Sequence, residues 1–411
     1  NTTASYNTAV GYQAAYSNTT GADNTAMGTA AMYPNTTGNY NAAFGSASLR
    51  QNTTGSYNTA LGQSALNQNT TAPRNTAVGY QSLYANTTGD NNTAIGEGSG
   101  KSNTTGHNNS FLGQDAGEAN TTGQYNVAVG SDALQANTTG VRNTIIGATA
   151  GDAITVGSYN CVMGYNAQGV DTKGSRSVAV GYGALGAQNF TSATDNYNVA
   201  IGFGAGASLS TGTNNVLIGG NVSQIDSGVV GETPVTTGNN NVVIGKAAQV
   251  SAANADAQIV LGFECTGASN TSLTFGKAAT DSNIDFGATS ITAPSDERYK
   301  EEITTATAGL SFINDLRPVT YKWKMEKDVP VNSKSYREGS EKRVMECGDK
   351  IMHGFIAQEV KAVIDNHSEI KDGFRMWAET DNFDNRQRVA PGELIPILVK
   401  SIQELSATND A

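Results

Sequence analysis

A 17-residue repeat occupies residues 1–290 and restricts the possible folds of this chain more than any other feature. The pattern Asn-Thr-Ala-Val-Gly, first seen at Asn7–Gly11, returns in register as far as Ser177–Gly181, then at looser spacing up to Gly262. The equivalent asparagines of the regular part are Asn24, Asn41, Asn58, Asn75, Asn92, Asn109, Asn126, Asn143 and Asn160. A short fixed period is typical of a solenoid, in which every repeat contacts only its neighbours.

Each repeat predicts one short strand, about four or five residues long, that ends at a glycine. The reference Asn is followed by a small, often β-branched residue and then by apolar ones, while two or more Gly in most repeats exclude a helix. Such a strand cannot bury its own face, but copies stacked about 4.8 Å apart can. We expect a mainly β solenoid with one repeat per turn, roughly 17 turns and on the order of 80 Å long. Two shorter echoes of the pattern, ending at Gly276 and Gly287, are counted among these turns.

Other positions of the repeat indicate tight packing and ladders. The third residue after the glycine is Ala or Ser, as at Ala14 and Ser48, which places it against neighbouring backbone. Seven turns also carry Asn-Thr-Thr-Gly, which predicts hydrogen-bonded Asn and Thr ladders; the motif begins at Asn18, Asn35, Asn52, Asn86, Asn103, Asn120 and Asn137. Asn-Thr-Thr is also an N-glycosylation acceptor pattern, so a rod with one glycan per turn is the alternative. The glycine-rich segment Gly202–Gly206 keeps the register of the repeat, which argues against a phosphate loop.

A single thin solenoid with few large apolar residues has a poor core, which association of several chains would repair. The turns of the form Asn-Thr-Ala-Val-Gly and Ser177-Val-Ala-Val-Gly181 resemble the Ser-Val-Ala-Ile-Gly turns of head domains in trimeric autotransporter adhesins. That resemblance covers most of residues 1–290. It implies left-handed parallel β-rolls, with three chains in one head.

Composition changes sharply after residue 290. Residues 1–294 hold 8 Lys and Arg and 15 Asp and Glu, whereas residues 295–411 hold 17 and 21, together with both tryptophans, Trp323 and Trp377. We expect a rod (residues 1–290), a linker (291–294) and a separate domain (295–411). Neither part is basic and no apolar run approaches about 18 residues, so we expect no nucleic-acid partner and no membrane insertion. The chain begins in mid-pattern without Met, so we expect a further N-terminal part that attaches to other proteins.

The domain at residues 295–411 reads as α+β. We expect a short helix over 310–316, a strand over 319–323, a loop or hairpin over 325–350, and a strand over 353–357 that leads into a helix over 358–364. Further strands are expected over 374–378 and 386–389, and a final helix over 392–405. On that helix Ile395, Leu398, Ile402 and Leu405 have the spacing of a short coiled-coil seam. The cysteines, including Cys347, lie far apart and no His or Cys has ligand spacing, so we expect neither metal nor cofactor.

Five motifs of this domain occur in the order and spacing of a known family. They are Ser295-Asp296-x-Arg298-x-Lys300, Leu316-Arg-Pro318 with Tyr321 and Trp323, Gly354-Phe-Ile-Ala-Gln-Glu-Val360, Leu394-Ile-Pro-Ile-Leu398 and Ile402-Gln-Glu-Leu405. They resemble the C-terminal intramolecular chaperone domain of phage tail spikes and tail fibres, including the endosialidases. The resemblance implies a domain that trimerises, assists folding of the preceding β-structured fibre and releases itself by autoproteolysis. It also implies that Ser295 is the nucleophile, that Lys300 assists it, and that the Ser295–Asp296 bond is cut.

The residue types suit that chemistry. A Ser hydroxyl needs a base, and Lys can serve as one only where burial lowers its pKa, which trimer assembly could provide. A spacing of five residues places the two side chains about 140° apart on an ideal helix, so the segment must bend to bring them together. The alternative is structural, because Ser-Asp-Glu is also an ordinary helix N-cap with acidic first-turn residues. Gln358 and Glu359 are expected to hydrogen-bond within the domain.

The sequence therefore favours a bacteriophage tail fibre: a homotrimeric rod in the virion that attaches to a host cell-surface receptor, either a glycan or an outer-membrane component. Self-cleavage would be its one enzymatic activity, because the rod shows no cluster of carboxylates and aromatics typical of a polysaccharide depolymerase. The alternative is a cellular or glycosylated extracellular adhesin or fibril whose C-terminal domain is a permanent trimerisation cap.

Overall fold

The computed structural model describes residues 3–224, 234–288, 291–292, 297, 300–331, 333, 335–345, 349–370, 374–379 and 387–409. The chain forms two compact units, Asn1–Ser295 and Asp296–Ala411, which are considered separately below. No helix in the described residues is long and apolar enough to cross a membrane.

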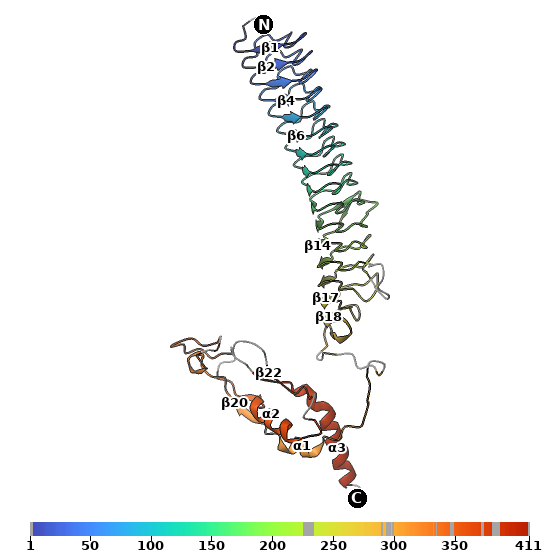
Figure 1. The fold of residues 1–411 in the computed structure, drawn as a ribbon, viewed down its shortest axis with the longest axis vertical. Helices are drawn as coiled ribbons and strands as arrows, with labels where there is room; N and C mark the ends of the chain where they lie inside the picture. The colour runs from blue at the N-terminus through green and yellow to red at the C-terminus, as the bar shows by residue number, and fades with distance from the viewer. Residues whose placement is uncertain are drawn as a thin grey trace. The chain divides into compact units, whose positions relative to one another are not determined.

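The first unit is a solenoid in which each 17-residue repeat contributes one strand to a single 17-stranded sheet (Figure 1). Consecutive strands pair in parallel, with each residue beside its equivalent in the next turn, as Thr8 is beside Thr25. The strands of this sheet are β1 (Thr8–Val10), β2 (Thr25–Met27), β3 (Ala42–Phe44), β4 (Thr59–Leu61), β5 (Thr76–Val78), β6 (Thr93–Ile95), β7 (Ser110–Leu112), β8 (Val127–Val129), β9 (Thr144–Ile146), β10 (Cys161–Met163), β12 (Val178–Val180), β14 (Val199–Ile201), β15 (Val216–Ile218), β16 (Val242–Ile244), β17 (Ile259–Phe263), β18 (Ser272–Lys277) and β19 (Ser282–Asp285). Two short strands, β11 (Gly174–Ser175) and β13 (Thr194–Asp195), form a separate pair. The prediction of one repeat per turn in a mainly β solenoid is confirmed.

Most strands have three residues, fewer than the four or five expected, because the backbone turns on both sides. The residue before the reference Asn is left-handed, as at Tyr40 with φ 56°, and the glycine after the strand has a positive φ, as at Gly45 with φ 131°. A Cβ on Gly45 would also lie 2.6 Å from the carbonyl oxygen of Gly62 in the next turn. The glycine is thus required by both conformation and space. The backbone N–H of Tyr40 donates to the carbonyl of Ala22, which holds the left-handed residue in place.

The core consists of three inward columns: the middle residue of each strand, the small residue three after the glycine, and the residue next to it. The first column is Ala and the second Ala or Ser in most turns, and the third is Leu in five turns (Leu49, Leu66, Leu83, Leu134 and Leu185), each of these leucines being fully buried. Val222 and Cys265 show that the small position accepts larger side chains near the end of the rod.

One turn reverses the usual sizes of the core residues. Phe111 is the middle residue of its strand, where most turns have Ala, and Gly100 and Gly117 stand where neighbouring turns have Leu. A Cβ on Gly117 would lie 2.5 Å from the Phe111 ring. The phenyl ring therefore fills the volume that two leucines leave, which keeps the packing density of the core.

Buried asparagines form two ladders along the rod. In the Asn-Thr-Thr column, the Asn52 Nδ2 donates to the Asn35 Oδ1 at 2.8 Å and to the carbonyl of Gly55 at 2.9 Å. In the reference column, the Asn58 backbone N–H donates to the Asn41 Oδ1 at 2.9 Å, and its Nδ2 donates to the carbonyl of Ala72. Thr hydroxyls donate to main-chain carbonyls one turn on. These contacts confirm the predicted ladders.

The burial of the ladder asparagines opposes the glycan interpretation. Asn52 and Asn86 have no exposed surface, and a glycan on Nδ2 would displace both ladder hydrogen bonds. The ladder ends at Asn137, because Ile154 takes the equivalent place in the next turn. The Asn137 Oδ1 has no hydrogen-bond partner in the described part of the chain.

The rod ends differently from the prediction. The echo ending at Gly276 is a parallel strand, β18, but the echo ending at Gly287 belongs to β19, which runs antiparallel to β18. Only the 3-10 helix η1 (Ala278–Thr280) and Asp281 separate the two strands, which is too few residues for a full turn of the coil. The chain therefore reverses there instead of coiling once more. Gly202–Gly206 lies in a regular solenoid turn, where Gly206 makes room for the Leu217 side chain.

The second unit combines short helices with two antiparallel strand pairs (Figure 1). Its elements are α1 (Leu310–Asp315), β20 (Val319–Tyr321), η3 (Glu326–Asp328), β21 (Met352–Gly354), α2 (Ala357–Asn366), β22 (Trp377–Glu379), β23 (Gln387–Val389), η4 (Pro391–Leu394) and α3 (Ile395–Asn409). The predicted α+β class and the final helix are confirmed. The strand expected over 353–357 is shifted toward the N-terminus, because α2 already begins at Ala357.

Candidate functional site

Ser295 and Asp296, the predicted nucleophile and the residue after the predicted cut, lie outside the described residues, as does Arg298. Lys300 is described: it is exposed in the single chain, and its backbone N–H donates to the carbonyl of Glu297 at 3.0 Å. The predicted dyad of Ser295 and Lys300 therefore remains a prediction. An exposed Lys300 agrees with the condition that its burial must come from assembly with other chains.

The helices of the second unit share one small core. Phe312 on α1, Val360 and Ile364 on α2, and Ile397 on α3 are buried together. The N-terminus of α1 is capped from a distance: the Leu310 backbone N–H donates to a Glu404 carboxylate oxygen on α3 at 2.8 Å. This carboxylate replaces the side-chain cap that α1 lacks in its own sequence.

Two of the C-terminal motifs meet in an ion pair. The Arg317 guanidinium of the Leu-Arg-Pro motif donates through Nε and a terminal nitrogen to both carboxylate oxygens of Glu359 on α2. These hydrogen bonds hold the pKa of the Glu359 carboxyl below its usual range and raise that of Arg317. The structural role predicted for Glu359 is confirmed, and the pair fixes α2 against the segment that follows α1.

His367 connects the ends of α1 and α2. Its Nε2 lies 2.9 Å from the Asp315 carboxylate and its Nδ1 lies 2.9 Å from the Glu369 carboxylate. The ring packs edge-on against the buried Phe312 at 5.2 Å between centroids. Hydrogen bonds to Glu369 and Asp315 raise the pKa of His367. The protonated imidazole therefore supports the fold of the domain.

The predicted coiled-coil seam lies on the outside of the domain. Ile402 is 66% exposed, and Ile395, Leu398 and Leu405 are also exposed, whereas Ile397 on the opposite face of α3 is 5% exposed. One face of α3 thus packs on the domain core and the other carries four apolar residues at heptad spacing in solvent. An exposed apolar row of this kind is typical of an association surface.

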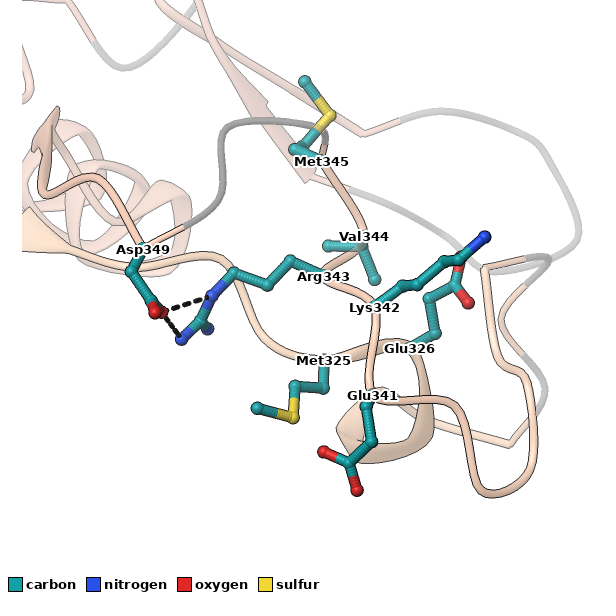
Figure 2. A pocket seen from close by; sticks show the side chains of 8 residues that line it. All are labelled: Met325, Glu326, Glu341, Lys342, Arg343, Val344, Met345 and Asp349. Carbon is teal, nitrogen blue, oxygen red and sulfur yellow. Dashed lines mark hydrogen bonds and ion pairs between the residues drawn. The ribbon is translucent and has the colours of Figure 1, made fainter.

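A hollow of about 550 Å³ lies between Met325 and Asp349. Figure 2 shows the eight side chains that line it. The Arg343 guanidinium is held by the Asp349 carboxylate and the Trp323 carbonyl, and Lys327 pairs with Glu341. Of the charged residues that line the hollow, Arg343 and Asp349 thus pair with each other, while Glu326 accepts a hydrogen bond from the Ser340 hydroxyl. Within the described residues no three His, Cys, Asp or Glu side chains gather as metal ligands, and Cys347 lies outside them.

Two features of this domain were not predicted from the sequence. The Glu404 cap joins Glu404 to Leu310, 94 positions away, and no local sequence pattern predicts this contact. The spacing of the apolar residues alone could not show which of them are exposed on α3, because the buried Ile397 lies between exposed seam residues in the sequence. The polar Ser401 beside Ile402 is also buried and donates to the Ile397 carbonyl at 2.8 Å.

Comparison with known proteins agrees with the C-terminal motifs. No curated protein and no solved structure matches the chain. Residues 295–369 match the family model described as the chaperone of endosialidase, which begins at the predicted nucleophile and ends after α2. The resemblance to endosialidase-type chaperones is thereby confirmed over these residues, and the motifs on α3 lie beyond the match. The chain thus joins a β-solenoid repeat rod to a C-terminal segment that matches the model of the endosialidase chaperone family.

Proposed function

We propose that this chain is the subunit of a homotrimeric fibre whose C-terminal domain assembles three copies and is then cut off after Ser295. The observation that carries the proposal is the chaperone-of-endosialidase match at residues 295–369, directly behind the solenoid. The exposed seam of α3 supplies an apolar surface through which the domains of three chains can associate. Of the two units, it is the rod that is expected to remain in the mature fibre.

The repetitive rod explains why such a domain would be needed. Its turns are so alike that sliding one chain past another by a whole turn replaces each contact with a near-identical one. The rods alone therefore define their mutual register poorly. A non-repetitive domain that associates first would hold the three chains in one register. The rods could then pack together turn by turn, starting from the end next to the domain.

Cleavage would follow from assembly. In the proposed step, Lys300 takes up the proton of the Ser295 hydroxyl, and the Ser295 oxygen attacks the carbonyl carbon of the Ser295–Asp296 bond. That peptide bond breaks, Lys300 passes the proton to the departing Asp296 amine, and one water hydrolyses the resulting ester. A lysine can accept a proton near neutral pH only where desolvation disfavours its charged form. Because the Lys300 side chain is exposed in the single chain, burial between chains would make cleavage report correct assembly.

Intact-mass spectrometry of the freshly expressed full chain tests the proposal. Wild type should give two fragments whose masses sum to the chain plus one water, with the cut after Ser295. Ser295→Ala and Lys300→Ala should remain whole. Lys324→Ala, which removes another exposed lysine of the same domain, should split like wild type. A wild-type chain that forms trimers and stays whole would contradict self-cleavage and favour a permanent trimerisation cap.

We further propose that the fibre belongs to a bacteriophage virion and binds a host surface receptor. The support is the endosialidase description of the matched family together with a rod of repeated turns. Purified fibre should compete with phage particles for adsorption to the host, and its removal from the particle should abolish adsorption. A cellular adhesin would instead be found on the surface of the cells that encode it.

A further inference from the structure

The large apolar side chains that the rod exposes are concentrated on one face. This face consists of four adjacent columns: the left-handed residue before each reference Asn, the first and third residues of each parallel strand, and the residue after the strand-ending glycine. We call it the strand face. Tyr40, Leu61, Met163 and Tyr182 are examples, each at least 46% exposed. Away from this face the described rod exposes few large apolar residues, among them Tyr16, Val156 and Val170.

The centre of the strand face is uncharged along its whole length. The third strand residue is Val, Met, Leu, Ile or Phe in every parallel strand from Val10 to Phe275. The first strand residue is a small or β-branched one in nearly every turn, from Thr8 to Ile259. Solenoid stability requires the inward middle residue to be apolar, but nothing in the single rod requires the outward third residue to be so. Apolar residues that recur at this outward position therefore indicate a surface that is covered by another protein chain.

Aromatic rows border this apolar centre. Tyr165, Tyr182 and Phe203 stack on one side, with centroids 5.6 Å and 5.0 Å apart. On the other side the Arg142 guanidinium lies 5.5 Å and 5.4 Å from the ring centroids of Tyr125 and Tyr159. An apolar centre with Tyr and Arg around it matches the composition of protein–protein interfaces.

We propose that the strand face packs against the same face of two further copies of this chain, parallel and at the same level. The proposal deepens the homotrimer of the proposed function, since it names the surface by which the rods associate. In a parallel, level arrangement each turn of one copy meets the same turn of the others, so the apolar columns coincide over the full rod. If each third strand residue buries about 50 Å², the column alone removes on the order of 800 Å² per copy, the size of a standard interface side.

The same geometry disfavours a saccharide as the occupant of this face. Sugars stack on the flat faces of aromatic rings, but here these faces are turned toward the rings of neighbouring turns. In the pair Tyr40 and Tyr57, for example, the ring centroids are 5.0 Å apart and the planes differ by 10°. The Arg176 Nε is engaged by the Asp195 carboxylate at 3.0 Å. The column of third strand residues, which are Val, Met, Leu, Ile or Phe, offers no hydrogen-bond donors for hydroxyl groups, so that the hydroxyl donors in the centre are those of Thr and Ser in the first-residue column. A second copy of the chain can pack on this face without free ring faces, an unpaired arginine or hydrogen-bond donors.

Two pairs of residues provide matched variants. On the strand face, Leu112 and Met163 are 37% and 46% exposed; on another face, Val156 and Val170 are 37% and 45% exposed. The full-length double variant Leu112→Lys/Met163→Lys places six like charges at two levels of the proposed interface. The control Val156→Lys/Val170→Lys adds the same charges where the rod should face water.

Cys161 provides a native probe in the same region. Its thiol is free and exposed in the single chain, as the first residue of β10 on the strand face. Cys265 is buried inside the rod, and this burial raises the pKa of its thiol to about 11. Maleimide labelling at neutral pH followed by peptide mapping therefore measures the accessibility of the Cys161 thiol separately from that of the other cysteines.

Native wild type and the control variant should form trimers and label at Cys161 at least tenfold more slowly than denatured chain. The Leu112→Lys/Met163→Lys variant should label rapidly, even if the C-terminal domains keep three chains together in native mass measurements. Trimeric wild type with rapid labelling of Cys161 would overturn the proposed face without touching the chaperone proposal. Equal labelling of the two double variants, or a different protein chain bound to the strand face, would overturn it as well.

Discussion

The rod and the C-terminal domain use hydrogen bonds over very different distances along the chain. In the rod, most side-chain ladders join residues 14 or 17 positions apart, and each turn repeats the contacts of the previous one. In the domain, Leu310 is capped by Glu404, and Arg317 pairs with Glu359, 42 positions away. Local contacts that repeat in every turn build a long structure from one short sequence pattern. Because all turns are alike, these contacts cannot specify the register between chains. Unique contacts can, which is the physical reason for placing a chaperone domain behind such a rod.

The largest expected effect is on the exceptional turn of the rod core. Phe111→Ala should lower the free energy of unfolding by about 3–5 kcal/mol, because Gly100 and Gly117 leave the cavity unfilled. Adding Gly117→Leu restores the size pattern of the other turns and should recover part of the loss. Gly117→Leu alone should destabilise, because its side chain would meet the Phe111 ring. Denaturant unfolding of the four proteins measures these changes, and a double variant no more stable than Phe111→Ala would contradict the exchange of volumes.

On α3, two isoleucines separate the fold of the domain from its association. Ile397→Ala should destabilise the domain by about 2–4 kcal/mol, because Ile397 is buried in its core. Ile402→Ala should change the stability of the single domain by less than about 0.5 kcal/mol, because Ile402 is on the exposed seam. Ile402→Ala should nevertheless raise the dissociation constant of the proposed trimer. Thermal unfolding at low concentration and sedimentation equilibrium distinguish the two effects; equal effects on both measurements would contradict the assignment of faces.

Removal of one ladder asparagine should have a smaller effect within the rod, about 2–3 kcal/mol for Asn52→Ala. The substitution leaves the buried Asn35 Oδ1 without its donor. It also removes one of two hydrogen bonds from the Gly55 carbonyl, which keeps Asn41, and from the Asn69 Nδ2, which keeps the Ala72 carbonyl. Gln51→Ala is the control, since Gln51 is the exposed neighbour of Asn52. Hydrogen exchange should show the loss confined to adjacent turns, whereas loss spread evenly along the rod would argue against nearest-neighbour stability.

The smallest effect concerns pH and falls on the domain alone. His367 has a raised pKa, so the stability it contributes is complete below its unfolded pKa of about 6.5 and is lost as pH rises through the folded pKa. The domain should therefore become less stable as pH rises above 6.5. His367→Gln should remove this slope, while His353→Gln, an exposed control on β21, should keep it. A slope unchanged in His367→Gln would show that other groups cause it.

The fold of the rod could largely be predicted from the sequence, since its repeat places equivalent residues one turn apart. Strand length and the reversal at β19 could not, because they depend on left-handed residues such as Tyr40 and on the length of the segment before Ser282. The exchange of sizes around Phe111 requires knowing which columns meet inside the rod.

For the candidate site, sequence motifs predicted the chaperone segment and the residues Ser295 and Lys300, but geometry adds what motifs lack. Glu404 caps a helix whose own sequence shows no cap, and only the packing of α3 reveals which of its apolar residues stay in solvent. Such pairings between distant segments have no signature in one sequence, because spacing carries information only within an element.

The most direct test of the account compares residues 1–295 expressed alone with the same rod produced as the full chain and then freed from its C-terminal domain. The account predicts that the rod made alone aggregates or stays unassembled, whereas the rod freed after assembly remains a trimer with Cys161 protected. Native mass spectrometry with maleimide labelling gives both readouts. Rods that form the same protected trimer without ever having carried residues 296–411 would contradict the chaperone role.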